Sequence, residues 1–342
     1  MRVAVDAMGG DHAPGRLVDG ALAAARNLGL GVDLVGRADL IDAELRRHPD
    51  ASSLDVRVID APDVVEMAES PAKALKRKKR ASIRVAADHV AAGHASAMFS
   101  AGHTGASVVA AHAAFGMLPG VDRPALAPTV PTKQGAAVLL DAGATVECRP
   151  SHLLQFAHMG ATYARVGLGI AQPRIGLLSI GEEATKGNEL TRDAHQLLKA
   201  SALTFVGNVE ARGIFSGAAD VVVCDGFTGN VALKLSEGLV EMVEDLLGEE
   251  LRSTFSSQVG YLLSRRAFRR FRRRVDYSEF GGAPLLGVAG LCIVGHGRSS
   301  VKAVRNAVAM ASRMAGNQMI ERLRPQMAQI AQMAGNGVQE QS

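Results

Sequence analysis

Short apolar runs alternate with helically spaced apolar positions along most of the chain. Each run suits a strand buried on both faces, and a turn rich in glycine and small residues follows it. These runs lie at residues 3–6, 32–35, 56–59, 97–100, 175–180 and 221–224. Because strands that alternate with helices form a parallel sheet covered on both sides, the pattern predicts an α/β fold with three layers, αβα, and a mostly parallel sheet.

Two kinds of segment interrupt this alternation. Residues 125–131 and 136–141 have the pattern of hairpin strands, and Pro128 and Pro131 place the first of them at a sheet edge. Residues 241–278 have the pattern of two long helices. They predict a helical hairpin that protrudes from the sheet and faces a membrane or a second subunit.

Length and composition favour one large domain with a short tail. The chain has 342 residues, of which 47% are hydrophobic and 21% charged, so a substantial core can be buried. Residues 1–330 are expected to form a single α/β domain. The tail at 331–342 becomes polar and glycine-rich, and we expect it to be flexible.

Several function classes are disfavoured by what the sequence lacks. The three cysteines, Cys148, Cys224 and Cys292, lie far apart and form no CxxC, which argues against a disulfide scaffold or a zinc site. Cys224 ends a valine run, so we interpret it as an inert core residue rather than a nucleophile. No GxxxxGK(S/T) is present and no GxGxxG follows a strand, which argues against a P-loop NTPase or an NAD-binding Rossmann unit. We expect neither a metal nor a cofactor.

The basic charge is concentrated in one segment. The net charge is +4, yet seven arginines within 265–274 leave the rest of the chain at −3, so a local partner is expected rather than nucleic acid. Four side chains of this segment share one side of a helical projection, namely Tyr261, Phe268, Phe271 and Val275. The pattern is typical of an interfacial helix on anionic lipid, with Leu262 and Leu263 at an exposed tip. A helix docked on a partner subunit is the alternative.

The N-terminus and the apolar runs also bear on location. Residues 1–6 read as a strand rather than as a signal peptide. No apolar run reaches the roughly 18 residues that a membrane-spanning helix needs. The sequence therefore predicts an intracellular protein that does not cross the membrane.

Candidate chemistry gathers in the turns that follow the predicted strands. Ligands of open α/β sheets bind outside the carboxyl ends of the strands, so we expect these turns to converge on one site. The stretch 221–234 is the centre of this expectation: a strand, a Gly-rich turn at 225–230, and a helix from Val231. Such a turn directs backbone N–H groups and a helix dipole toward an anion. Its glycines also have a purely structural interpretation, since any tight strand–helix turn needs them.

Three other turns carry polar side chains with two interpretations each. Lys186 is either an anion holder between glycines or part of a solvated acidic loop that is capped at Asn188. His103 and Thr104 either line an anion site or are ordinary loop residues. Asp11 either orients the site or caps a turn. Residues 73–80 carry six cations in eight positions, which form either a solvated helix face or a dock for an acidic protein or phosphate groups.

These motifs occur together in one order. They are DAMGGD at 6–11 followed by Pro14, ALKRK at 74–78, SAGHTGA at 100–106, GEEATKG at 181–187, VCDGFTGNVALK at 223–234, GGAPLLG at 281–287 and HG at 296–297. From about residue 1 to about 320 the chain closely resembles the bacterial phosphate acyltransferase family, also called acyl-ACP:phosphate transacylase. Two positions depart from the family's pattern, because His103 and Thr145 stand where the family usually has Asn.

The resemblance implies a fold like that of isocitrate/isopropylmalate dehydrogenases and phosphotransacetylases. It implies transfer of a long-chain acyl group from acyl carrier protein to inorganic phosphate, giving acyl phosphate for phospholipid synthesis. It also implies a homodimer in the cytoplasm, peripherally associated with the inner face of the cell membrane. Phosphate is already an anion and a thiolate leaves readily, so the reaction mainly needs positioning and donors for the oxyanion.

On this basis Lys186 is expected to carry the charge of phosphate or oxyanion, and Asn230 to donate to the same centre. The expected phosphate- and substrate-binding residues are Asp6, Gly9, Gly10, Asp11, Ser100, His103, Thr104, Gly105, Glu183, Asp225, Gly226, Thr228 and Gly229. The expected carrier-protein dock is Lys76, Arg77 and Lys78, and the expected membrane contacts are Leu262, Leu263, Phe268 and Phe271.

Two other functions remain open at this point. A short-chain phosphotransacetylase that uses coenzyme A would share the fold, but it would need no membrane contact and hence no arginine-rich helix. A membrane-surface scaffold without catalysis would explain that helix, but it would not explain the clustered turns.

Overall fold

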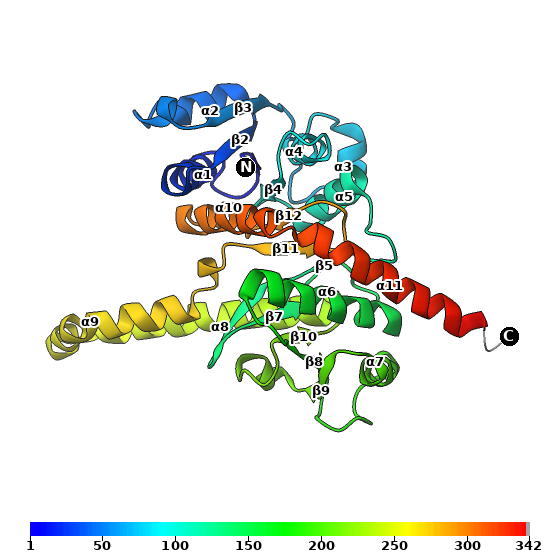
Figure 1. The fold of residues 1–342 in the computed structure, drawn as a ribbon. Helices are drawn as coiled ribbons and strands as arrows, with labels where there is room; N and C mark the ends of the chain where they lie inside the picture. Colours follow the sequence, from blue (N-terminus) through cyan, green and yellow to red (C-terminus); the bar gives the residue numbers. More distant parts are fainter. Residues whose placement is uncertain (340–342) are drawn as a thin grey trace.

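The computed structural model describes residues 1–339 of the chain. Its strands form two sheets, one of seven strands in the order β3-β2-β1-β4-β12-β11-β5 and one of five strands in the order β6-β7-β10-β8-β9 (Figure 1). The first sheet contains β1 (Arg2–Asp6), β2 (Gly31–Gly36), β3 (Val56–Asp60), β4 (Ala97–Ser100), β5 (Ala125–Leu126), β11 (Ala283–Leu286) and β12 (Cys292–Val294). The second contains β6 (Thr129–Thr132), β7 (Gly135–Leu140), β8 (Arg174–Leu178), β9 (Thr204–Val209) and β10 (Val221–Val223).

Pairing within both sheets is mostly parallel. In the first sheet β1 pairs with β2 and β4, β2 with β3, and β4 with β12, all parallel, while β11 is antiparallel to β12 and β5. In the second sheet β10 lies parallel between β7 and β8, β9 is parallel to β8, and β6 is antiparallel to β7 at the edge. The three-layer αβα fold with mostly parallel strands is therefore confirmed, with its strands divided between two sheets.

The helices connect and cover these sheets. They are α1 (Gly15–Leu28), α2 (Ala38–Leu45), α3 (Pro71–Arg77), α4 (Ser82–Ala91), α5 (Thr104–Phe115), α6 (Pro150–Leu168), α7 (Glu189–Ala200), α8 (Gly226–Ser253), α9 (Phe255–Val275), α10 (Val301–Gly316) and α11 (Met319–Gln339). Three short 3-10 helices lie at Ala51–Ser53, Ala211–Phe215 and Tyr277–Glu279.

Alternation of side chains along the strands divides the core into layers. Val5 of β1 and Phe99 of β4 pack with α1 and α10 on one face of the seven-stranded sheet. Their neighbours Ala4 and Met98 pack with α4 and α5 on the other face. This is the period of two expected for strands that are covered on both sides. The first cluster continues through α6 into the five-stranded sheet, so both sheets share one core.

The predicted hairpin strands are divided between the sheets. The stretch 125–131 breaks into two strands: β5 joins the first sheet by pairing with β11, and β6 pairs with β7. Pro131 lies on β6 at the sheet edge, as its missing N–H predicted.

Helices α8 and α9 lie side by side and extend beyond the sheets, as predicted for the protruding hairpin (Figure 1). Arg272 of α9 holds Glu244 of α8 through two hydrogen bonds of 3.0 and 2.9 Å. Among the helices of residues 1–339, none is long and apolar enough to cross a membrane.

The C-terminal segment differs from a plain coil. Helix α11 continues to Gln339 and thus includes most of the segment 331–342. The last residues, 340–342, lie outside the described residues, and flexibility of the tail stays a prediction.

Candidate functional site

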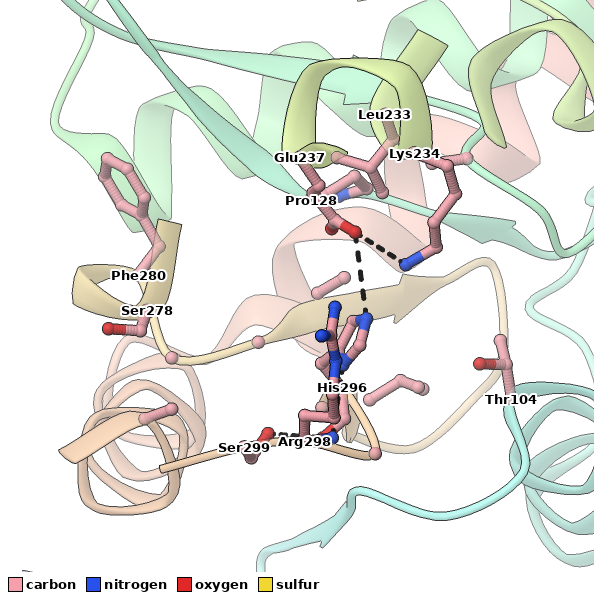
Figure 2. Close-up of a pocket in the computed structure, with 18 of the residues that line it drawn as sticks. Thr104, Pro128, Leu233, Lys234, Glu237, Ser278, Phe280, His296, Arg298 and Ser299 are labelled. Carbon is pink, nitrogen blue, oxygen red and sulfur yellow. Dashed lines mark hydrogen bonds and ion pairs between the residues drawn. The ribbon is translucent and has the colours of Figure 1, made fainter. Parts of the chain in front are cut away.

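A cavity of about 860 Å³ lies between elements of the two sheets (Figure 2). One wall is the first half of α8, which contributes Asn230, Lys234 and Glu237. The opposite wall includes Thr104 at the start of α5 and the loop after β12 with His296. The carboxyl ends of strands from both sheets therefore meet at one cavity, as expected for an α/β fold.

The start of α8 is fixed by a cap. The Asp225 carboxylate accepts the backbone N–H of Thr228 at 2.9 Å and the Thr228 hydroxyl at 2.7 Å. This places Asp225 at the N-cap, and the helix begins at Gly226. The predicted start at Val231 was therefore wrong by five residues. The Gly-rich segment is thus the first turn of the helix and not a loop before it.

Two glycines let this first turn approach the end of β7. A Cβ at Gly229 would lie 1.9 Å from the carbonyl oxygen of Asp141, and one at Gly226 would lie 2.5 Å from the Asp141 carboxylate. Asp141 itself is buried and accepts four backbone N–H groups, from Leu126, Gly143, Ala144 and Thr145. Burial raises the pKa of Asp141 despite these donors. Close backbone packing on the Asp141 turn therefore sets the position of Asn230 in the cavity.

The opposite wall depends on a second buried carboxyl group. Asp6, at the end of β1, accepts the hydroxyl of Ser100 at 2.7 Å and the N–H of Met8 at 3.2 Å. Burial raises the pKa of Asp6. His103 caps α5, because its Nδ1 accepts the N–H of Gly105 at 3.1 Å. Together these contacts hold Thr104 at the cavity wall.

The structure brings part of the predicted set together. Asp11, Thr104 and Asn230 line the large cavity. A smaller cavity of about 210 Å³ is lined by Asp6, Gly9, Gly10, Asp11 and His103, among others. Ser100 is buried under Asp6, and Gly105 packs near Pro71. Asp225, Gly226, Thr228 and Gly229 build the helix start rather than the cavity wall.

Lys186 and Glu183 lie elsewhere, on an exposed loop after β8. Neither lines either cavity. The loop is anchored, since the Asn208 amide donates to the carbonyl of Glu183 at 2.8 Å. The catalytic role of Lys186 stays a prediction. Thr145 donates its hydroxyl to the carbonyl of Pro124 at 2.8 Å and does not line the large cavity.

Sequence reasoning missed a cluster of charged groups in the large cavity. One oxygen of Glu237, Oε2, lies 2.8 Å from Lys234 Nζ and 3.7 Å from His296 Nε2. Next to it Arg298 donates to Glu241 at 2.8 Å. Burial lowers the pKa of His296, which keeps the imidazole neutral at neutral pH. Helical spacing from Asn230 was the available signal, since positions four and seven residues later share its face.

Apolar side chains line another part of the same cavity. They are Leu126, Pro128, Leu233, Val240, Val275, Phe280, Ala283 and Val294. The site therefore combines polar groups at its reactive wall with room for an apolar group, a usual combination in small-molecule sites. Among the described residues, no group of three or more His, Cys, Asp or Glu side chains could hold a metal ion.

The residues predicted to contact the carrier protein lie at the end of α3, and those predicted to contact the membrane lie on α9. Lys76 is exposed on α3, whereas Arg77 and Lys78 both pair with Glu69. On α9 the exposed fractions of Leu262 and Leu263 are 65% and 81%. Phe271 is exposed, and Phe268 is half-buried against the ring of Tyr261.

Comparison with known proteins adds the family. The model of the fatty acid synthesis protein family matches residues 1–322. The chain is 52% identical over 311 residues to a phosphate acyltransferase from a Geobacter species, covering 91% of this chain and 88% of that protein. It is 50% identical over 311 residues to a phosphate acyltransferase from Heliobacterium modesticaldum, covering 91% and 93%.

Solved structures with a similar fold have low sequence identity. A phosphotransacetylase from Streptococcus pyogenes superposes with a TM-score of 0.61 at 16% identity, covering 92% of this chain and 94% of that one. A 4-hydroxythreonine-4-phosphate dehydrogenase from Klebsiella pneumoniae gives 0.54 at 14% identity, covering 92% and 99%. At such identities the likeness concerns the fold alone.

Proposed function

We propose a function on the premise that this chain is an acyltransferase, since it belongs to the fatty acid synthesis protein family and its relatives named above are phosphate acyltransferases. The proposed reaction transfers a long-chain acyl group from acyl carrier protein to inorganic phosphate, and the acyl phosphate then enters phospholipid synthesis. The observation that carries this proposal is the large cavity, which joins polar groups of both sheets with an apolar lining.

The reaction requires positioning more than a strong base. A phosphate oxygen attacks the thioester carbonyl carbon, negative charge develops on the carbonyl oxygen, and the thiolate leaves. Donors aimed at that oxygen lower the barrier when they are fixed in advance. In the proposal the Asn230 amide and the Thr104 hydroxyl supply such donors, because both line the cavity and both lie near the N-termini of helices.

The apolar lining supports a long acyl chain as the transferred group. Leu233, Val240 and Phe280 line the cavity on the side of α8 and of the segment that follows α9. A chain that enters there would leave its thioester near Asn230. An acetyl group would leave these side chains without a partner, which favours a long-chain donor over acetyl coenzyme A.

Basic residues near the cavity support an acidic carrier protein as the donor. Pro71 at the start of α3 packs against Gly105 of α5, so the basic helix lies beside the turn that holds Thr104. Lys76 is exposed there, whereas Arg77 and Lys78 share their charge with Glu69. In the proposal Lys76 contributes more to steering than its two neighbours. Lys76→Glu should raise the KM for acyl carrier protein several-fold at low salt, and Lys199→Glu on α7 serves as the control.

The hairpin of α8 and α9 supports peripheral attachment to anionic membrane at the cytoplasmic face, together with a homodimer. Leu262 and Leu263 form an exposed tip beside the arginines of α9. Leu263→Asp should reduce flotation with vesicles that contain phosphatidylglycerol.

A second apolar row, on α8, supports the homodimer. It is exposed in the single chain and would suit a second copy, and its members are Val231, Leu235, Leu239, Met242 and Leu246. Leu239→Asp should shift sedimentation toward the monomer.

One assay tests the proposed reaction against its alternatives. The protein is incubated with palmitoyl acyl carrier protein and phosphate, and acyl phosphate is trapped as hydroxamate. Hydroxamate from this donor but not from acetyl coenzyme A is expected, and Asn230→Ala should reduce it about a hundredfold. Equal or better use of acetyl coenzyme A would support a phosphotransacetylase, and no product from either donor would support a scaffold. Lys186→Ala, assayed in parallel, tests the role predicted for that lysine.

A further inference from the structure

Three titratable side chains in the large cavity surround one point. Lys234 and Glu237 lie on α8, His296 follows β12, and Figure 2 shows all three directed toward the same space, with Thr104 on the far side. Glu237 Oε2 accepts a hydrogen bond from Lys234 Nζ at 2.8 Å and lies 3.7 Å from His296 Nε2. The Glu237 side chain is only 12% exposed, so this carboxylate is mostly removed from water.

Hydrogen bonding defines which nitrogen of His296 carries the proton. Its Nδ1 accepts the backbone N–H of Arg298 at 3.2 Å. The proton of the neutral ring therefore lies on Nε2, the nitrogen that faces Glu237. At 3.7 Å this N–H is too far from Glu237 to form a hydrogen bond, so it remains free to donate to a ligand.

We propose that Lys234, Glu237 and His296 form the subsite for the hydrogen phosphate dianion, an assignment that rests on the proposed function. Lys234 and His296 donate to two of the unprotonated phosphate oxygens. Glu237 accepts the P–OH hydrogen, which is the one donor that this anion carries. This hydrogen bond from P–OH to Glu237 would also explain why a carboxylate lies in an anion site. Glu237 accepts the hydrogen of hydrogen phosphate but repels an anion that carries no hydrogen, and it thereby selects between them.

The subsite also fixes the path of the proton. An unprotonated phosphate oxygen forms the bond to the thioester carbon, and the C–S bond breaks with its electron pair on sulfur. The P–OH proton passes to Glu237 and then to the thiolate. The products are an acyl phosphate dianion and a free thiol, and Glu237 returns to its carboxylate form.

Discrimination between phosphate and sulfate tests this assignment. Sulfate has the size and charge of hydrogen phosphate but no hydroxyl group at neutral pH, so the wild type should be inhibited weakly by it. Glu237→Gln removes the charge and keeps the shape. This variant should raise the KM for phosphate about tenfold or more and should strengthen sulfate inhibition by a similar factor. Lys234→Met should raise the KM for phosphate at least tenfold and leave the KM for acyl carrier protein within about twofold.

Matched controls separate this subsite from general effects on the helix. Glu249 lies on the same helix at an exposed position outside the cavity. Glu249→Gln should change neither the KM for phosphate nor the inhibition by sulfate. If Glu237→Gln fails to fold, His296→Gln provides the second variant, and it should also raise the KM for phosphate. Unchanged phosphate KM and unchanged sulfate inhibition in a folded Glu237→Gln or His296→Gln variant would overturn the assignment. So would a rise in phosphate KM with Lys186→Ala but not with Lys234→Met.

Direct binding separates failure of the subsite from failure of the proposed reaction. Titration calorimetry with inorganic phosphate needs no acyl donor. Weaker phosphate binding by Glu237→Gln and Lys234→Met than by the wild type is expected even if no acyl donor has been found. Equal binding by all three proteins would reject the subsite, whereas absence of acyl transfer alone would reject only the proposed reaction.

Discussion

The close approach of α8 to the end of β7 makes Gly229 a sensitive position. In Gly229→Ala the new Cβ would lie 1.9 Å from the carbonyl oxygen of Asp141 and 2.8 Å from the sulfur of Cys224. Ordinary van der Waals contact begins at 3.4 Å, so the first turn of α8 must retreat by about 1.5 Å. Overpacking of this kind costs about 1–3 kcal/mol or more of unfolding free energy.

The same shift should also affect catalysis. Asn230 follows Gly229 directly and lies close to Gly143. A Cβ atom built on Gly143 would lie 3.7 Å from the Asn230 side chain. Misplacement of a positioning group by about 1 Å can cost on the order of a hundredfold in rate. We therefore expect kcat/KM of Gly229→Ala to fall at least a hundredfold, measured as trapped hydroxamate. A thermal melt followed by circular dichroism should show a lower Tm.

A matched substitution on the same helix gives the comparison. Gly238 also lies within α8, but no atom lies within 4 Å of its Cβ position. Gly238→Ala should retain activity and gain about 0.5–1 kcal/mol, because alanine is the better helix former. If Gly229→Ala matched Gly238→Ala in both activity and Tm, the close approach would not be what positions Asn230.

Three further predictions concern stability and reactivity. Burial lowers the pKa of His158 from 6.5 to about 4, so the folded state binds this proton less readily than the unfolded state. The contribution of the neutral His158 to stability is therefore complete above pH 6.5, and about 3 kcal/mol of it is lost by pH 4. The unfolding free energy of His158→Asn, measured with urea, should depend less on pH over that interval than that of the wild type. Asp225→Ala removes the cap of α8 and should cost about 1 kcal/mol by urea unfolding, whereas Asp225→Asn should restore most of it. Burial raises the pKa of Cys148 and Cys292 to about 12, so iodoacetamide at pH 8 should label these thiols only after unfolding, as mass spectrometry would detect.

Local patterns in the sequence were sufficient for most of the fold. The runs at β1, β2, β4 and β10 are buried on both faces, so their unbroken apolar character was a direct signal. Strands β9, β11 and β12 gave weaker signals. β9 is partly exposed, β11 contains Pro284, and β12 follows β11 with no helix between them, outside the strand–helix alternation. The division into two sheets depends on pairing of β5 with β11, which are distant in sequence, and no local pattern specifies it.

One wall of the candidate site could also be predicted from local sequence patterns, and the other could not. Its α8 wall could be read from the sequence, because Asn230, Lys234 and Glu237 recur at helical spacing after a recognisable strand and turn. The His296 wall could not be read, because it requires β12 to pair with β4 and thereby place the loop after β12 beside α5. A motif shows that His296 follows a glycine-rich segment, but only the sheet order shows what it faces. The groups proposed to bind phosphate thus come from two walls. Helical spacing determines the positions of Lys234 and Glu237, whereas strand pairing between distant segments determines that of His296. Substitutions at Lys234 and at His296 should therefore share one phenotype, a raised KM for phosphate, although nothing in the sequence links the two residues.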